Sequence, residues 1–226
     1  MPIISSVSGN FSPIGRSRKP FNLATGGTTA DVTNYNGTGQ IWRVHTLTSG
    51  QTLSVINSFD QFTILVAGGG AAGCIGVCGS GQVSCAGSGG GSGGYFNGLA
   101  TIPIGSHSIT IGSGGTASGG AGGTTSLGSI QSCTGGATHS GQAAGIAGSP
   151  NGINGGSNSD SNMTYKTSNI TGSSVFYCAG GSGYYGTNVT YSGSGGKAAQ
   201  RSGGDYPDGS GFNGTAGTVI VAYQIA

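Results

Sequence analysis

The chain has 226 residues, of which 52 are glycine and only 12 are charged, seven basic and five acidic, for a formal net charge of +2. An ordinary domain is about 7% glycine and about a quarter charged. An α-helical protein is excluded, because each interior glycine costs a helix about 1 kcal/mol. Irregular glycine spacing and only six prolines exclude collagen. Because 34% of the residues are hydrophobic, the chain also lacks the composition of a disordered protein.

The longest apolar run, residues 62–67, is far shorter than the ~20 residues of a membrane span. The first residues do not have the basic-then-apolar pattern of a signal peptide. We therefore expect a protein that is made in a cytoplasm, without membrane insertion. Cytoplasmic folding favours reduced thiols. If any cysteines pair, Cys74–Cys85 or Cys78–Cys178 are the pairings that we would guess.

We interpret residues 1–29, and most clearly residues 1–22, as an extended N-terminal arm, because Pro2, Pro13 and Pro20 block a helix. Such an arm could be a solvated terminus. Its apolar residues and clustered cations instead favour docking onto a partner by strand addition. The docking residues that we expect are Ile3, Ile4, Phe11, Arg16, Arg18, Lys19 and Phe21.

Residues 30–226 are predicted to form one all-β domain with essentially no α-helix. Alternating or continuous apolar runs bounded by Gly, Asn and Ser indicate strands. We expect strands at 41–47, 53–56, 62–67 and 218–225, a hairpin of 99–104 and 108–111 turning at Gly105–Ser106, and β-structure within 165–177. The nearly continuous apolar strand 62–67 is expected to be central and buried on both faces. Strands 62–67 and 218–225 bracket the glycine-rich region and should meet in a β-sandwich.

Residues 68–217 contain 45 of the 52 glycines. A flexible linker is one interpretation of such a stretch. The other is a set of packed polyglycine II rods, which have three residues per turn and no internal hydrogen bonds, so that their N–H and C=O groups must pair with neighbouring rods. We favour rods, because a linker would not contain Cys, Ile, Val and aromatic residues at intervals. The tracts expected as rods are 68–73, 87–94, 119–123, 135–136, 180–183 and 193–196.

Five blocks in fixed order resemble one family: 42–46 (WRVHT), 63–70 (TILVAGGG), 109–115 (ITIGSGG), 123–129 (GTTSLGS) and 217–223 (GTVIVAY). The pattern over roughly residues 30–226 resembles the glycine-rich domain of bacteriophage tail and tail-fibre proteins. The composition is similar to that of receptor-binding adhesins of T-even-like phages, whose polyglycine II sandwich displays variable loops. Residues 2–9 look like N-terminal arms of structural proteins in cyanophages. The chain departs from the family in its cysteines and its sparse aromatic loop tips.

The resemblance implies a non-enzymatic virion protein of the tail or tail fibre that adheres to a host surface. It implies other virion subunits as partners, a host surface receptor, homo-oligomerisation in the particle, and no nucleic acid or cofactor. The alternative is a capsid or tail decoration protein that cements neighbouring subunits through its arm. A secreted cell-wall glycine-rich protein is disfavoured by the expected lack of a signal peptide.

Catalytic and metal sites are not predicted. The gaps between Cys74, Cys78 and Cys85 do not match the C-x2-C spacing of zinc sites, and no helix or acidic residue completes a dinucleotide motif. Aromatic residues flanked by glycine are better candidates, because aromatic side chains are enriched at recognition surfaces; they could also simply cap the rods. The candidate ligand-binding loop tips are Tyr95, Phe96, Asn97, Tyr184, Tyr185, Tyr191 and Tyr206.

Overall fold

The computed structural model describes residues 21–74, 84–116, 120–138, 143–157, 163–183, 186–202 and 211–226, except the side chains of residues 84–86 and 200–202. Over these residues the fold is all-β, with one 3-10 turn, η1 (Tyr35–Gly37), and no α-helix. The strands are β1 (Leu23–Thr25), β2 (Thr28–Val32), β3 (Trp42–Leu47), β4 (Thr52–Asn57), β5 (Phe62–Ala67), β6 (Ser84–Ala86), β7 (Tyr95–Ala100), β8 (Gly105–Thr110), β9 (Thr125–Leu127), β10 (Gln131–Cys133), β11 (Lys166–Ser168), β12 (Val175–Tyr177), β13 (Gln200–Ser202) and β14 (Thr218–Gln224).

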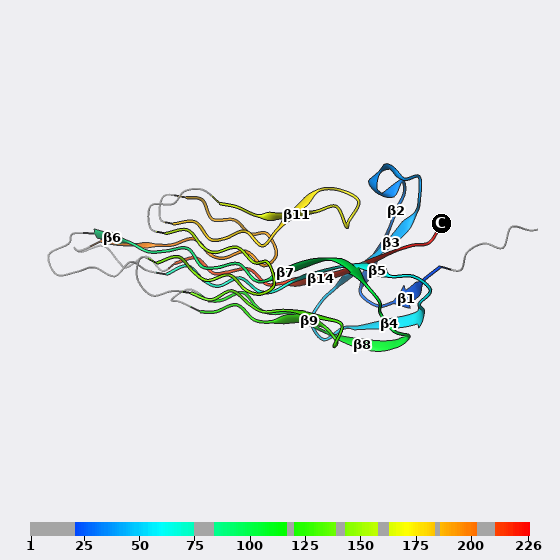
Figure 1. The fold of residues 1–226 in the computed structure, drawn as a ribbon. Coiled ribbons are helices and arrows are strands. Elements are labelled where there is room, and N and C mark those ends of the chain that lie inside the picture. Colours follow the sequence, from blue (N-terminus) through cyan, green and yellow to red (C-terminus); the bar gives the residue numbers. More distant parts are fainter. Residues whose placement is uncertain are drawn as a thin grey trace, which may run out of the picture.

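Two five-stranded antiparallel sheets, in the orders β1-β4-β8-β9-β10 and β2-β3-β14-β5-β7, form a β-sandwich at one end of the molecule (Figure 1). The predicted strands 41–47, 53–56, 62–67 and 218–225 are all present within one or two residues. Strand β14 pairs with β5, Thr218 opposite Ala67, so the strands that bracket the glycine-rich region meet as predicted. Two short pairs, β11–β12 and β6–β13, complete the described strands.

The two hydrophobic clusters lie on opposite faces of the sheet that contains β14. Phe62, Ile64 and Val66 of β5 point between the two sheets, whereas Leu65 and Ala67 pack on the outer face against the β11–β12 hairpin. Side chains alternate along a strand, so this division follows from the sequence. All five side chains are fully buried, which confirms that β5 is a central strand covered on both faces.

One strand pairing and one boundary predicted from the sequence are wrong. The hairpin expected over residues 99–111 does not form, because β7 pairs with β5 and β8 pairs with β4 in the other sheet. The chain crosses between the sheets at 101–104, where Ile102 is fully buried in the core and Pro103 has no N–H for a ladder. The predicted arm boundary at residue 29 is also too late, because β1 and the start of β2 already belong to the sandwich.

A buried polar group ties the first residues of the sandwich to its central strands. His45 of β3 is fully buried, with its Nδ1 2.7 Å from the Gly26 carbonyl and its Nε2 3.2 Å from the Tyr223 hydroxyl. The Ala24 N–H donates to that same hydroxyl at 3.0 Å. Burial lowers the pKa of His45 below its ordinary 6.5, and the bond to Gly26 only partly offsets this effect.

The His45 pKa predicts a stability that falls in mild acid. Above pH 6.5 the imidazole is neutral in both states and its contribution is complete; as the pH falls towards the lowered folded pKa, the unfolded chain binds the proton first. We expect the melting temperature to decrease between about pH 6.5 and pH 5. A His45→Gln variant should melt lower throughout and show a smaller pH dependence of its melting temperature than the parent. A pH dependence equal to the parent's would contradict this role of His45.

The glycine-rich residues form straight segments that run side by side away from the sandwich (Figure 1). Segment 68–74 continues β5 and follows a three-residue repeat, in which its N–H groups donate in turn to three neighbours at 2.8–2.9 Å. The donors are Gly68, Ala71 and Cys74 to segment 88–94, Gly69 and Ala72 to segment 120–123, and Gly70 and Gly73 to segment 212–215. Carbonyls of the same segment accept from residues 115, 136, 196 and 199. Three residues per turn with all hydrogen bonds to neighbours is the polyglycine II pattern.

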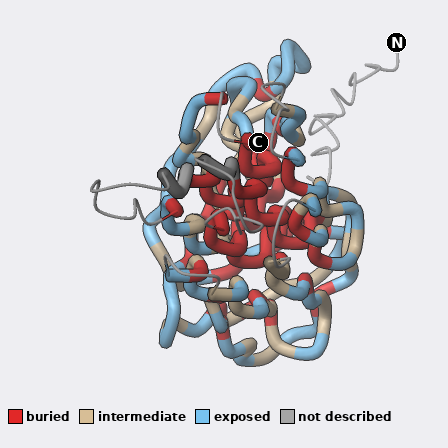
Figure 2. The backbone as a smooth tube through the Cα atoms, turned by 90° about the vertical axis from the view of Figure 1, so that its left-hand side faces the viewer, coloured by how far each residue is buried: buried red, intermediate tan, exposed pale blue. Residues whose placement is uncertain are grey.

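Segment 87–94 repeats the pattern. Its residues 87, 90 and 93 donate to carbonyls 199, 196 and 193, and residues 89 and 92 donate to carbonyls 156 and 153. The two segments, which we call the central rods, are buried along their described lengths, and Figure 2 shows buried backbone in the middle of the array with exposed segments around it. The described part of the glycine-rich region is therefore a packed hydrogen-bonded array rather than a linker.

Glycine is required in the central rods because backbone occupies the place of a side chain. A Cβ built on Gly70, Gly73 or Gly91 would lie closer than 3.0 Å to the carbonyl group of a neighbouring segment. Serines occupy positions where a small side chain fits and its hydroxyl can form hydrogen bonds. The buried Ser92 Oγ, for example, donates to the Gly93 carbonyl at 2.9 Å and accepts from the Ile153 N–H at 2.8 Å.

Candidate functional site

Three of the expected loop-tip residues lie in strand β7 instead. Tyr95 is buried, packs on Tyr177 with 6.3 Å between ring centroids, and donates its hydroxyl to the Thr167 carbonyl at 3.0 Å. Phe96 faces the core between the sheets, and only Asn97 is exposed, on the outer face of the sheet. The flanking glycines suggested a loop, but they belong to the end of a central rod, which passes directly into β7. Tyr95 and Phe96 are thus packing residues.

Tyr191 joins an aromatic cluster with Tyr165 and Phe176. Its ring centroid lies 5.3 Å from that of Phe176 and 6.3 Å from that of Tyr165, and the latter two rings are 4.3 Å apart. Tyr165 and Phe176 are 46% and 37% exposed, so the cluster lies at the surface, beside the β11–β12 hairpin. The sequence singled out Tyr191 but gave no reason to place it beside the other two rings.

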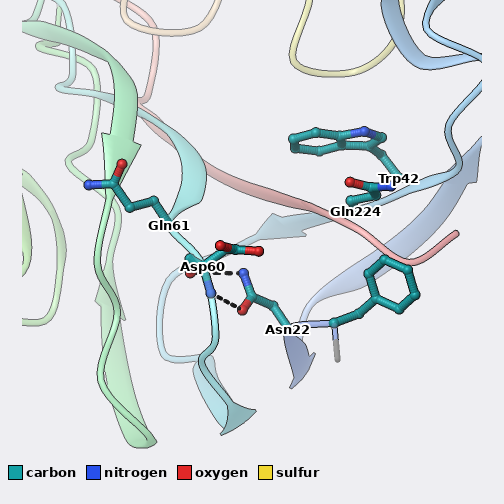
Figure 3. Close-up of a pocket in the computed structure, with 6 residues that line it drawn as sticks. Asn22, Trp42, Asp60, Gln61 and Gln224 are labelled. Atoms are coloured by element: carbon teal, nitrogen blue, oxygen red, sulfur yellow. Dashed lines mark hydrogen bonds between the residues drawn. The ribbon is translucent and has the colours of Figure 1, made fainter. Parts of the chain in front are cut away.

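Most of the remaining expected site residues lie outside the described residues: Tyr184, Tyr185, Tyr206, Ile3, Ile4, Phe11, Arg16, Arg18 and Lys19. Phe21 is described, and it lines a hollow of about 90 Å³ with Trp42, Gln224 and the Asp60–Gln61 turn. Asn22 also lines this hollow, and Figure 3 shows its hydrogen bonds to Asp60. The Asn22 amide donates to the Asp60 carbonyl at 3.0 Å and accepts from the Phe59 and Asp60 N–H groups. Asn22 therefore stabilises the β4–β5 turn.

A larger hollow, of about 240 Å³, lies on the outer face of the sheet. We call it the Asn97 hollow; its lining residues are Tyr35, Asn36, Thr63, Asn97, Ser168, Asn169 and Ile170. Strands β5 and β7 supply Thr63 and Asn97, the β2–β3 connection supplies one wall, and the β11–β12 hairpin supplies the other. Figure 1 shows this connection and this hairpin rising from the same side of the sheet.

Hydrogen bonds fix the polar groups of the Asn97 hollow. Asn97 Nδ2 donates to Ser168 Oγ at 3.0 Å, and the same oxygen accepts the Ile170 N–H at 3.1 Å. The Tyr35 ring stacks on Trp42 with 4.5 Å between centroids and an interplanar angle of 17°. Burial raises the pKa of Tyr35, so its hydroxyl stays protonated and able to donate. Of the lining residues, only Asn97 could be picked out from the sequence, because the others come from segments far apart in the chain.

Cys133 and Cys178 are free and buried, and Cys74 is buried as well. The guessed pairing Cys78–Cys178 is therefore wrong, whereas the Cys85 side chain of the other guessed pairing, Cys74–Cys85, lies outside the described part of the structure. Burial raises the pKa of the Cys133 thiol to about 11 and that of Cys178 to about 12. Cys133 Sγ lies 3.2 Å from the Val66 carbonyl, where β10 packs on β5. These thiols fill the core as small apolar side chains.

The buried thiols predict a labelling pattern. At pH 8 almost none of Cys133 or Cys178 is thiolate, the reactive form, and the fold shields both sulfur atoms. We expect iodoacetamide to modify these two residues only after denaturation, as mapped by peptide mass spectrometry. Complete labelling of either residue within minutes in the native protein would contradict its burial.

Within the described part of the chain, no group of three His, Cys, Asp or Glu side chains is arranged to hold a metal ion. The same residues contain no helix that is long and apolar enough to cross a membrane. No family model, no curated protein and no solved structure matches the chain. The rod array and the Asn97 hollow are therefore the features of the molecule that bear on its function.

Proposed function

We propose that the protein is a non-enzymatic structural protein of a bacteriophage virion, in the tail or tail fibre, and that it adheres to a host surface. The observation that carries the proposal is the array of polyglycine II rods on a β-sandwich. Such an array is a rigid scaffold, because each central rod is hydrogen-bonded to several neighbours. The sequence beyond the far ends of the rods can vary without disturbing the rods.

The difference between the two ends of the molecule supports this role. The described chain starts and ends at the sandwich, whereas the rods lead away from it (Figure 1). Cys74 and Gly87 lie at the ends of the central rods that are far from the sandwich. An arm that precedes Phe21 would hold the sandwich end on other virion subunits, or on further copies of this chain, and leave the far end for the host receptor.

Labelling of purified particles tests the proposal. We expect antibodies against the recombinant protein to mark the tail or fibre in electron micrographs of the phage that encodes the chain, and to reduce adsorption to its host. Labelling of the head would favour the alternative of a decoration protein. Particles that lack the protein altogether would overturn both.

Deletion of residues 1–20 separates folding from assembly. The remaining chain should keep its melting temperature within a few degrees, because it retains Asn22 with its bonds to the β4–β5 turn and β1 begins at Leu23. It should be absent from particles if the arm is the anchor. Normal incorporation of the truncated protein would show that the arm does not anchor it.

A further inference from the structure

The Asn97 hollow presents neutral hydrogen-bonding groups and no charge. Its lining contains three amides, two hydroxyls from Ser168 and Thr63, the Tyr35 ring and Ile170. An amide offers both donors and acceptors, as a hydroxyl does. Asp, Glu, Lys and Arg are all missing from this lining. A charged ligand would lack a counter-charge here, whereas a ligand rich in hydroxyl groups could pair with several side chains at once.

The walls of the hollow are rigid. The Tyr35 ring is 6% exposed and is held in place by stacking on Trp42, and Ile170 is 2% exposed at the opposite wall, so the accessible lining consists mainly of the amides and hydroxyls. A sugar ring has the matching character, since its hydroxyl groups can each donate and accept hydrogen bonds. With about 240 Å³, the hollow is smaller than typical drug-sized pockets of roughly 300–1,000 Å³ and suits one ring.

Part of the hollow is held in place by the fold. The bond from Asn97 to Ser168 uses one of the two N–H donors of the amide and joins β7 to the hairpin. Ser168 is itself 6% exposed and also accepts from the Ile170 N–H. A ligand that bonds to Asn97 would not have to order this side chain, which reduces the entropic cost of binding.

We infer that the Asn97 hollow binds one neutral sugar residue of a glycan. The assignment of this glycan to a host surface rests on the proposed function. The binding of a sugar by the hollow does not depend on it. The site lies on the side of the sandwich, apart from the far ends of the rods.

Glycan binding by the purified full-length protein tests this inference. The probe is an array of immobilised glycans with neutral hexose, N-acetylhexosamine and deoxyhexose termini, beside sialylated and sulfated glycans. We expect binding to a subset of the neutral glycans that persists at high salt, because no ion pair is involved. Binding to none of them, or to acidic glycans alone, would overturn the inference.

Three variants locate the site. Asn97→Asp keeps the shape but removes the amide donors and adds a charge, and Asn169→Ala removes an exposed amide from the wall; each should weaken binding about tenfold, which corresponds to about 1.4 kcal/mol. Asn57→Ala, in β4 of the other sheet, is the matched control and should bind as the parent does. Melting temperatures within a few degrees of the parent's verify folding. Unchanged binding in both hollow variants would place the sugar elsewhere and overturn the assignment.

The virion role and the sugar site would be contradicted by different results. Glycan binding without a place in the particle would contradict the virion role and leave the hollow as a sugar site. A protein that is found on the tail but binds no glycan would contradict the sugar site in the Asn97 hollow and leave the virion role in place.

Discussion

Replacing Gly91 by valine is expected to lower the melting temperature by roughly 2–12 °C, from an overpacking cost of about 1–3 kcal/mol in a chain of this size. Gly91 lies in the middle of a central rod, where an added Cβ would meet the Ile146 carbonyl closer than 3.0 Å. Its own carbonyl accepts the Ala71 N–H at 2.8 Å, so a displaced rod would also lose bonds to the other central rod.

Gly98→Val is the matched control for this prediction. Gly98 lies in strand β7 with an ordinary backbone conformation, and its added Cβ would meet only the Phe96 ring, no closer than 3.2 Å. Valine also suits a strand. We expect a small change there and an intermediate one for Gly120→Val, whose Cβ would meet the Thr116 backbone at 2.7 Å. In a flexible linker Gly91→Val would be neutral or slightly stabilising, so an unchanged melting temperature would contradict the packed array.

Truncating Phe62 to alanine is expected to cost about 3–5 kcal/mol, the usual range for a buried phenylalanine. Phe62 is fully buried between the two sheets and meets Tyr223 edge-on, with 5.4 Å between ring centroids at 78°. Tyr223 in turn holds Ala24 and His45. The cavity would therefore loosen contacts among β1, β3, β5 and β14.

Phe59 provides the control for Phe62, because it is the same residue type in the same turn region but 55% exposed. Phe59→Ala should change stability by less than about 0.5 kcal/mol. Denaturant unfolding of the two variants measures the difference. A Phe62→Ala variant as stable as Phe59→Ala would show that the core between the sheets is not packed as described.

The strands and the rods could be predicted from the sequence because both depend on local chemistry. Alternating or continuous apolar runs are sufficient to place 42–47, 62–67 and 218–224 in strands. Dense glycine interrupted by Cys, Ile and aromatic residues pointed to packed rods. The tracts 68–73 and 87–94 form them, because only glycine lets backbones approach so closely.

Features that depend on distant segments could not be predicted. The apolar spacing through Ile102 and Ile104 looks the same for a hairpin as for a chain that crosses between two sheets. Glycine before Tyr95 resembles a loop signal, yet here it ends a rod that continues as β7. The Asn97 hollow joins residues 35–36, 63, 97 and 168–170, which come from four parts of the chain and share no motif.

Amide hydrogen exchange of the glycine-rich region tests the central claim most directly. In the packed array the N–H groups of residues 68–74 and 87–94 are hydrogen-bonded to neighbouring rods and buried. Peptides that cover these residues should therefore exchange as slowly as those that cover β5 and β14. Complete exchange of both central rods within seconds, while β5 and β14 stay protected, would show that the glycine-rich half is a solvated linker and would contradict the account.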